Sequence, residues 1–212
     1  MNKTELVFIL DRSGSMGGLE MDTIGGFNST LEAQSKLEGE TRVSTILFDN
    51  QFEELHDRIN LSDIRPLTSE QYFVRGSTAL YDAVAMGIRK ITNAQMAVKT
   101  NARADKVIVV IITDGYENSS RETSAAMLKK MIEEKRAEGW EFIFMGANID
   151  AALAAGEIGI SASNAANYVP DSRGVKIQYE CLSNAVISLR SGQPMPKDWQ
   201  GRTEADKKQR GK

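Results

Sequence analysis

Continuous apolar runs that stop abruptly at polar loops constrain the fold of this chain most strongly. The run at 6–10 reads LVFIL and stops at Asp11, and the run at 107–112 reads VIVVII and stops before Thr113. A third run, FIFM, occupies 142–145. Strands that are apolar on both faces are typical of parallel sheets covered by helices on each side. These runs therefore predict buried parallel strands.

Two weaker strands and one short strand complete the predicted sheet. Residues 43–48 and 52–56 are separated only by a turn at Asp49 and Asn50, and so short a connection predicts an antiparallel hairpin. Residues 166–169 predict a short last strand before a proline. We expect one antiparallel strand in a mostly parallel sheet.

Between the strands, apolar side chains recur at helical spacing. The predicted helices are marked by stripes that begin at Ile24, Leu80, Leu128 and Val175, and by an alanine-rich segment at 151–158. Strands that alternate with helices predict an α/β fold of the doubly wound, Rossmann-like type, with helices on both faces of the sheet.

The 212 residues, 41% of them hydrophobic, suffice for one domain, which we assign to 1–191. The remaining segment, 192–212, is predicted to be a basic, flexible tail. From residue 197 onward it carries six basic and three acidic side chains, whereas the whole chain has a net charge of -3. A frayed, solvated tail is the simple interpretation, and a contact for a polyanion or an acidic partner is the alternative.

Composition also narrows location and partners. The lone Cys181 excludes an internal disulfide and is expected in the core. The polar opening MNKTE is unlike a signal peptide, and no apolar run approaches the roughly 20 residues of a membrane span. We therefore expect a cytoplasmic protein that binds neither membrane nor nucleic acid. The oligomeric state stays open.

Three short motifs place side-chain oxygens where a doubly wound fold carries its sites, beyond the carboxyl ends of the strands. The segment DRSGS supplies Asp11, Ser13 and Ser15, which can point the same way from an extended loop. A GST segment supplies Thr78, and TDG supplies Asp114. Each motif alone also fits an ordinary turn or helix cap. Together they indicate a site.

This combination resembles the metal-ion-dependent adhesion site of von Willebrand factor A domains, over roughly residues 4 to 191. The resemblance implies a fold in which the strands at 6–10 and 107–112 are neighbours. It also implies a metal site that uses all five positions, namely Asp11, Ser13, Ser15, Thr78 and Asp114. Mg²⁺, or else Mn²⁺ or Ca²⁺, suits such oxygen ligands. An Asp or Glu of a partner protein is then expected to complete the coordination.

Residues around these motifs are candidates for partner recognition. Tyr116, Glu117 and Asn118 follow TDG and are expected on the rim of the site. Arg12, inside the first motif, is expected to be exposed and able to pair with an acidic ligand. His56, the only histidine, is expected at or near the surface of an edge strand.

The main rival to a binding module is an enzyme. A haloacid dehalogenase-type phosphatase also keeps an aspartate after its first strand, but it needs a second one where this chain has Ser13. Neither a GxSxG turn nor a nucleotide-binding glycine motif occurs. We expect no catalysis, and an intracellular bacterial or phage-related assembly role. An adaptor of an ATPase or stress-response system, or a scaffold without metal, remains an alternative.

Overall fold

A six-stranded sheet in the order β3-β2-β1-β4-β5-β6 forms the centre of the computed structural model, which describes residues 3–211. All neighbouring pairs are parallel except β2 and β3, so the predicted antiparallel edge strand is confirmed. The strands are β1 (Lys3–Asp11), β2 (Glu40–Phe48), β3 (Phe52–Asn60), β4 (Lys106–Thr113), β5 (Glu141–Gly146) and β6 (Ala165–Asn167).

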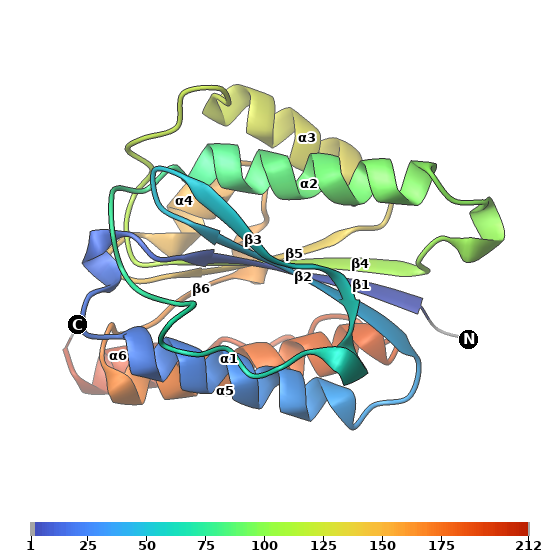
Figure 1. Cartoon of the computed structure of the whole chain (residues 1–212). Helices are drawn as coiled ribbons and strands as arrows, with labels where there is room; N and C mark the ends of the chain where they lie inside the picture. The colour runs from blue at the N-terminus through green and yellow to red at the C-terminus, as the bar shows by residue number, and fades with distance from the viewer. Residues whose placement is uncertain (1–2, 212) are drawn as a thin grey trace.

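Helices cover both faces of the sheet, as the sequence predicts (Figure 1). On one face lie α1 (Glu20–Ser35), α5 (Ser172–Arg190) and α6 (Gly201–Gln209). On the other lie α2 (Leu80–Met96), α3 (Ala125–Ala137) and α4 (Ala151–Glu157).

The central strand β1 contributes to two separate hydrophobic cores. Leu6 and Phe8 pack with the α1 and α5 side, while Val7 and Ile9 pack with the α2 side. Successive side chains of a strand point to opposite faces, so a strand buried on both sides must be apolar throughout. Burying each such side chain contributes roughly 1.5–3 kcal/mol.

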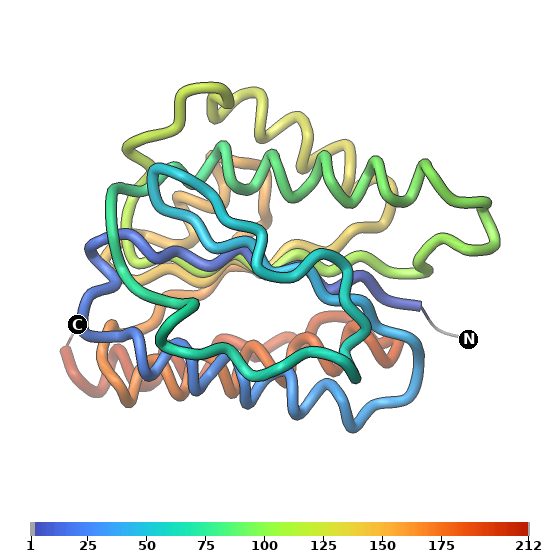
Figure 2. Tube along the Cα trace, viewed as in Figure 1, coloured from blue at the N-terminus to red at the C-terminus, as the bar shows by residue number. Residues whose placement is uncertain are grey.

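Helices α1 and α5 run side by side beneath the sheet, although they lie at opposite ends of the chain (Figure 2). Gly26 of α1 packs tightly against the buried ring of Tyr179 in α5. A Cβ atom on Gly26 would lie 2.0 Å from that ring. Only glycine fits at this contact.

The C-terminal segment differs from the predicted frayed tail. It forms helix α6, which packs against α5 and β6. Trp199 ahead of the helix is only 6% exposed, and its ring Nε1 donates to the carbonyl of Ser163 at 2.7 Å. Thr203 and Asp206 are buried as well. The basic composition of the segment concealed these anchors, because they are a tryptophan, a threonine and an aspartate scattered among charged residues.

Three smaller expectations can be compared with the structure. Cys181 is buried in the core, and His56 is half-buried on the edge strand β3, so both placements are confirmed. Among residues 3–211, no helix is both long enough and apolar enough to span a membrane.

Adjacent glycines in α1 give a matched test of the α1–α5 contact. Gly26→Ala should lower the free energy of unfolding by about 1–3 kcal/mol, because its methyl group would overlap the Tyr179 ring. Gly25→Ala meets no atom within 4 Å and should raise stability by about 0.5–1 kcal/mol through helix propensity. Urea unfolding measures both, and equal effects would contradict the proposed close contact.

Candidate metal centre

The site lies at the carboxyl ends of the neighbouring strands β1 and β4, where the order of strands along the sheet reverses. Asp11 ends β1, and Thr113 ends β4. The hydroxyl of Thr113 donates to Oδ2 of Asp11 at 2.6 Å. The sheet thereby brings Asp11 and Asp114 together, which is the neighbourhood that the sequence resemblance implied.

The loop after β1 turns its oxygen-bearing side chains to one side. The backbone N–H of Ser13 donates to Oδ1 of Asp11 at 2.7 Å. The hydroxyl oxygens of Ser13 and Ser15 lie 3.0 Å apart, and the Ser15 hydroxyl donates to Oδ1 of Asp114 at 2.6 Å. A continuous row of oxygens therefore runs from the first motif to the last.

Thr78 reaches the same place from the loop before α2. Asn118 fixes that loop, since its Oδ1 accepts from the Thr78 N–H at 2.9 Å. A Cβ atom on Gly115 would lie 3.6 Å from the Ser15 hydroxyl oxygen and 3.7 Å from that of Thr78. The absence of a side chain at Gly115 thus leaves room between the two hydroxyls.

Burial makes both carboxylates of the site expensive to ionise. Asp11 is fully buried, and desolvation raises its pKa to about 6, although hydrogen bonds from Thr113 and Ser13 oppose the rise. Burial also raises the pKa of Asp114, against the bond from Ser15. Oδ2 of Asp114 is buried without any hydrogen-bond partner among the described residues. A buried oxygen without a donor is rare in folded proteins and calls for an explanation.

The donor set fits a hard divalent cation. Hydroxyl and carboxylate oxygens are the ligands that Mg²⁺, Mn²⁺ and Ca²⁺ accept, and a cation would neutralise the two buried carboxylates. Within residues 3–211, no group of three or more histidine, cysteine, aspartate or glutamate side chains is placed to hold a metal. The oxygen row described above has two carboxylates and relies on hydroxyls for its other oxygens, so it is a different kind of site.

The model of the von Willebrand factor type A domain matches residues 5–176, most of the chain. The chain belongs to this family. Domains of the family serve as protein–protein interaction modules. No curated protein sequence matches the chain.

Solved structures share the fold at low sequence identity. The tip protein Mfa5 of type V pili from Porphyromonas gingivalis is 11% identical, with a TM-score of 0.61, over 88% of this chain and 95% of its vWF domain. Proximal thread matrix protein 1 from the mussel byssus, with a zinc-occupied MIDAS motif, is 14% identical, with a TM-score of 0.58, over 87% and 46%. Manganese-loaded TRAP from Plasmodium vivax is 17% identical, with a TM-score of 0.53, over 74% and 63%. The chain thus spans under half of the mussel protein.

The predicted rim residues of this von Willebrand A domain differ in their exposure and in their hydrogen bonds within the chain. Tyr116 is 55% exposed. The carboxylate of Glu117 accepts from the N–H groups of Tyr81, Ser119 and Ser120, so it ties the rim to the start of α2. Asn118 holds Thr78. Tyr116 is therefore the rim side chain most available to a partner, and contact with a partner remains a prediction for all three.

The expectation that Arg12 is exposed was wrong. Its side chain is 0% exposed, and its Nε donates to Oδ2 of Asp49 at 3.0 Å. Its Nη1 donates to Glu53 at 2.7 Å, and the guanidinium lies over the ring of Phe73. Arg75 donates to the same Asp49 oxygen at 2.7 Å. The acidic partners of Arg12 are thus internal. Through Asp49, Arg12 joins the loop after β1 to the β2–β3 turn, and Arg75 joins the loop before α2 to the same turn.

Two supporting residues were missed from the sequence. Thr113 orients Asp11, and its place directly before Asp114 in TDG was an available signal. The hydroxyl of Tyr72 donates to the backbone carbonyl of Asp11 at 2.5 Å. Tyr72 comes from an irregular segment 61 residues away, and no local pattern indicates that contact.

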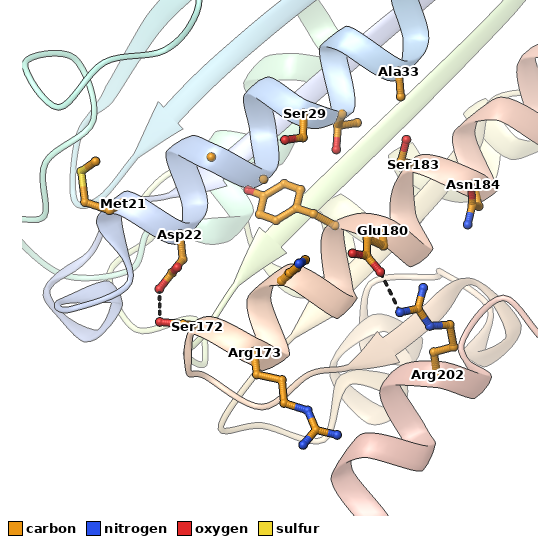
Figure 3. A pocket seen from close by; sticks show the side chains of 15 residues that line it. Met21, Asp22, Ser29, Ala33, Ser172, Arg173, Glu180, Ser183, Asn184 and Arg202 are labelled. Carbon is orange, nitrogen blue, oxygen red and sulfur yellow. Dashed lines mark hydrogen bonds and ion pairs between the residues drawn. The ribbon is translucent and has the colours of Figure 1, made fainter.

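A larger groove of about 860 Å³ lies away from the oxygen row, between α1 and α5 (Figure 3). None of the five predicted ligands lines it. At its edges the Ser172 hydroxyl donates to Asp22, and Arg202 pairs with Glu180. The groove is therefore separate from the oxygen row.

Replacing Arg12 tests whether its ion pair with Asp49 stabilises these loops. Arg12→Ala should lower the free energy of unfolding by about 3–5 kcal/mol, because the buried carboxylate of Asp49 loses one of its two cationic partners. Arg75→Ala removes a more exposed partner of the same carboxylate and should cost less. Chemical denaturation of both variants decides the order, and a smaller loss for Arg12→Ala would contradict the structure.

Asp11 predicts an unusual pH dependence in the metal-free protein. Its folded pKa, about 6, lies above the ordinary value of 3.8, so the folded state holds the proton more tightly. The free energy of unfolding should therefore fall as pH rises from about 4 to above 6, by up to about 3 kcal/mol. Asp11→Asn should flatten much of this slope and be the more stable protein at pH 7 in chelator. Unfolding curves between pH 4 and 8 test this, and parallel profiles would count against a raised pKa.

Proposed function

We propose that this domain binds a partner protein through a divalent cation held by Asp11, Ser13, Ser15, Thr78 and Asp114. Mg²⁺ is the ion we favour, and Mn²⁺ and Ca²⁺ are alternatives. The bound cation supplies a positive centre with a free coordination position. An Asp or Glu side chain of the partner fills that position. The bacterial or phage-related, intracellular setting and the identity of the partner stay predictions.

The observation that carries this proposal is the buried Oδ2 of Asp114. It has no donor among the described residues, and it belongs to a carboxylate whose other oxygen already accepts from Ser15. Two buried carboxylates so close to each other raise the cost of ionisation, whereas a cation between them removes that cost. The hydroxyls add ligands without adding negative charge.

This balance of charge explains why an acidic partner is favoured. Two carboxylates neutralise a divalent cation only in part when waters separate them from it, so an anionic ligand is attracted to the open position. Asp11 is held by Thr113 and Ser13, and Thr78 by Asn118, so the chain keeps its oxygens in place before any partner arrives. The mussel protein with a zinc-occupied MIDAS motif and manganese-loaded TRAP share this fold, and their metals support a cation here.

Mg²⁺ should raise the melting temperature of the protein by a few degrees at pH 7.5, because a ligand that binds only the folded state stabilises it. Asp11→Ala should abolish that rise. Asp198→Ala, which removes an exposed carboxylate outside the site, should keep it. Thermal unfolding with Mg²⁺ and with chelator measures the shift.

An Mg²⁺ shift that survives in Asp11→Ala would overturn the site. The partner half of the proposal is tested with the same proteins. Wild-type protein on a column should capture a partner from lysate in Mg²⁺ and release it in chelator, and Asp11→Ala should capture none. Capture that ignores the chelator would count against binding through a cation.

A further inference from the structure

Two neighbouring hollows beside the oxygen row share two lining residues, and together they are called the groove. The first, about 370 Å³, is lined by Ser15 and Asp114 together with Asn148 and Pro170. The second, about 310 Å³, shares Asn148 and Pro170 and extends to Lys207 of α6. Tyr116 from the rim lines the second hollow. The lining of the two hollows thus extends from the oxygen row to α6.

Lys207 is the cation at the far end of this groove. Its side chain is half-buried, and within residues 3–211 its ammonium group makes no ion pair and no hydrogen bond. The neighbouring cations differ, because Arg210 pairs with Asp171 and Asp206, and Arg173 pairs with Asp206. Lys207 is therefore the cation of α6 that faces the groove without an ion pair among the described residues.

The α6 helix is anchored firmly enough to present that charge. Arg210 bridges it to Asp171, the residue before α5, and Asp171 itself lines the first hollow. Trp199 fixes the segment before the helix to the end of the sheet. The basic C-terminal segment thus belongs to the same face as the oxygen row.

Asn148 lines both hollows. It is exposed and has a φ of 55°, in the left-handed region that asparagine adopts more readily than most residues other than glycine. Its amide can donate to and accept from a peptide backbone that passes through the groove.

We propose that this groove binds an extended acidic segment of a partner protein that carries two carboxylates a few residues apart. One carboxylate enters at the metal site, and the other pairs with Lys207. Asn148 contacts the backbone between them, and Tyr116 forms a wall. This inference rests on the proposed function, and it adds to it a second point of recognition.

Charge favours a peptide over a nucleic acid in this groove. Lys207 is the single lysine or arginine that lines either hollow within the described residues. A chain of phosphates would need several cations in a row. Two separated carboxylates need one cation each.

Fluorescence polarisation with labelled peptides tests the proposal. The probes are hexaglutamate, a hexapeptide with one glutamate among glycine and serine, and a six-nucleotide single-stranded DNA. In Mg²⁺ the wild-type protein should bind hexaglutamate about tenfold more tightly than the single-glutamate peptide, as for a paired charge in a part-buried site. The oligonucleotide should bind no better than the single-glutamate peptide.

Lys207→Glu should lower the affinity for hexaglutamate about tenfold or more, to the level of the single-glutamate peptide. It should leave the Mg²⁺-induced rise in melting temperature unchanged. Lys208→Glu is the matched control, since it makes the same charge change at an exposed neighbour that lines neither hollow. Asn148→Ala should lower the affinity for hexaglutamate severalfold.

The outcomes separate the two proposals. Equal losses in Lys207→Glu and Lys208→Glu would overturn the second point of recognition, as would equal wild-type affinities for the two peptides. Hexaglutamate binding that ignores chelator and Asp11→Ala, but still depends on Lys207, would overturn the proposed function instead. Tighter binding of the oligonucleotide than of hexaglutamate would overturn the acidic peptide as ligand.

Discussion

The parallel pairing of β1 with β4 is the constraint on which the rest of the site depends. It places the end of one motif beside the end of another, and the bond from Thr113 to Asp11 joins them directly. The loops from β1 and before α2 then meet above this junction through the N–H of Gly14 and the carbonyl of Gly76, 3.1 Å apart. Without that pairing, the five oxygen-bearing residues would be unrelated turn and cap residues.

Several charged side chains are buried at this end of the sheet. Asp11 and Asp114 are desolvated close together, and their pKa values rise as a result. Beside them, Arg12 and Asp49 form an ion pair that is fully buried. Such a pair does little for net stability but is costly to break, so it fixes the relative position of the loops. The loops are thereby held in place around the two buried carboxylates.

The C-terminal helix changes how the whole face is understood. Six basic residues near the end of the chain fit either a solvated tail or a contact for an acidic partner. Anchoring through Trp199 and Arg210 brings α6 to the groove beside the oxygen row, which favours the second interpretation. The positive charge of Lys207 and the proposed cation then form two points on one surface, both suited to carboxylates.

The sequence by itself determined the fold class and the antiparallel edge strand, because strand burial and short connections are local patterns that need no knowledge of distant contacts. Its short motifs and the family resemblance they carry named the five positions that are proposed as ligands. Tertiary structure alone decided the burial of Arg12, the bond from Tyr72 to Asp11 and the docking of α6. Each of these depends on partners far away in the chain. Arg12 is charged and follows a strand end, so the local pattern predicts that it is exposed. Its ion pairs with Asp49 and Glu53 offset the free-energy cost of burying its charge.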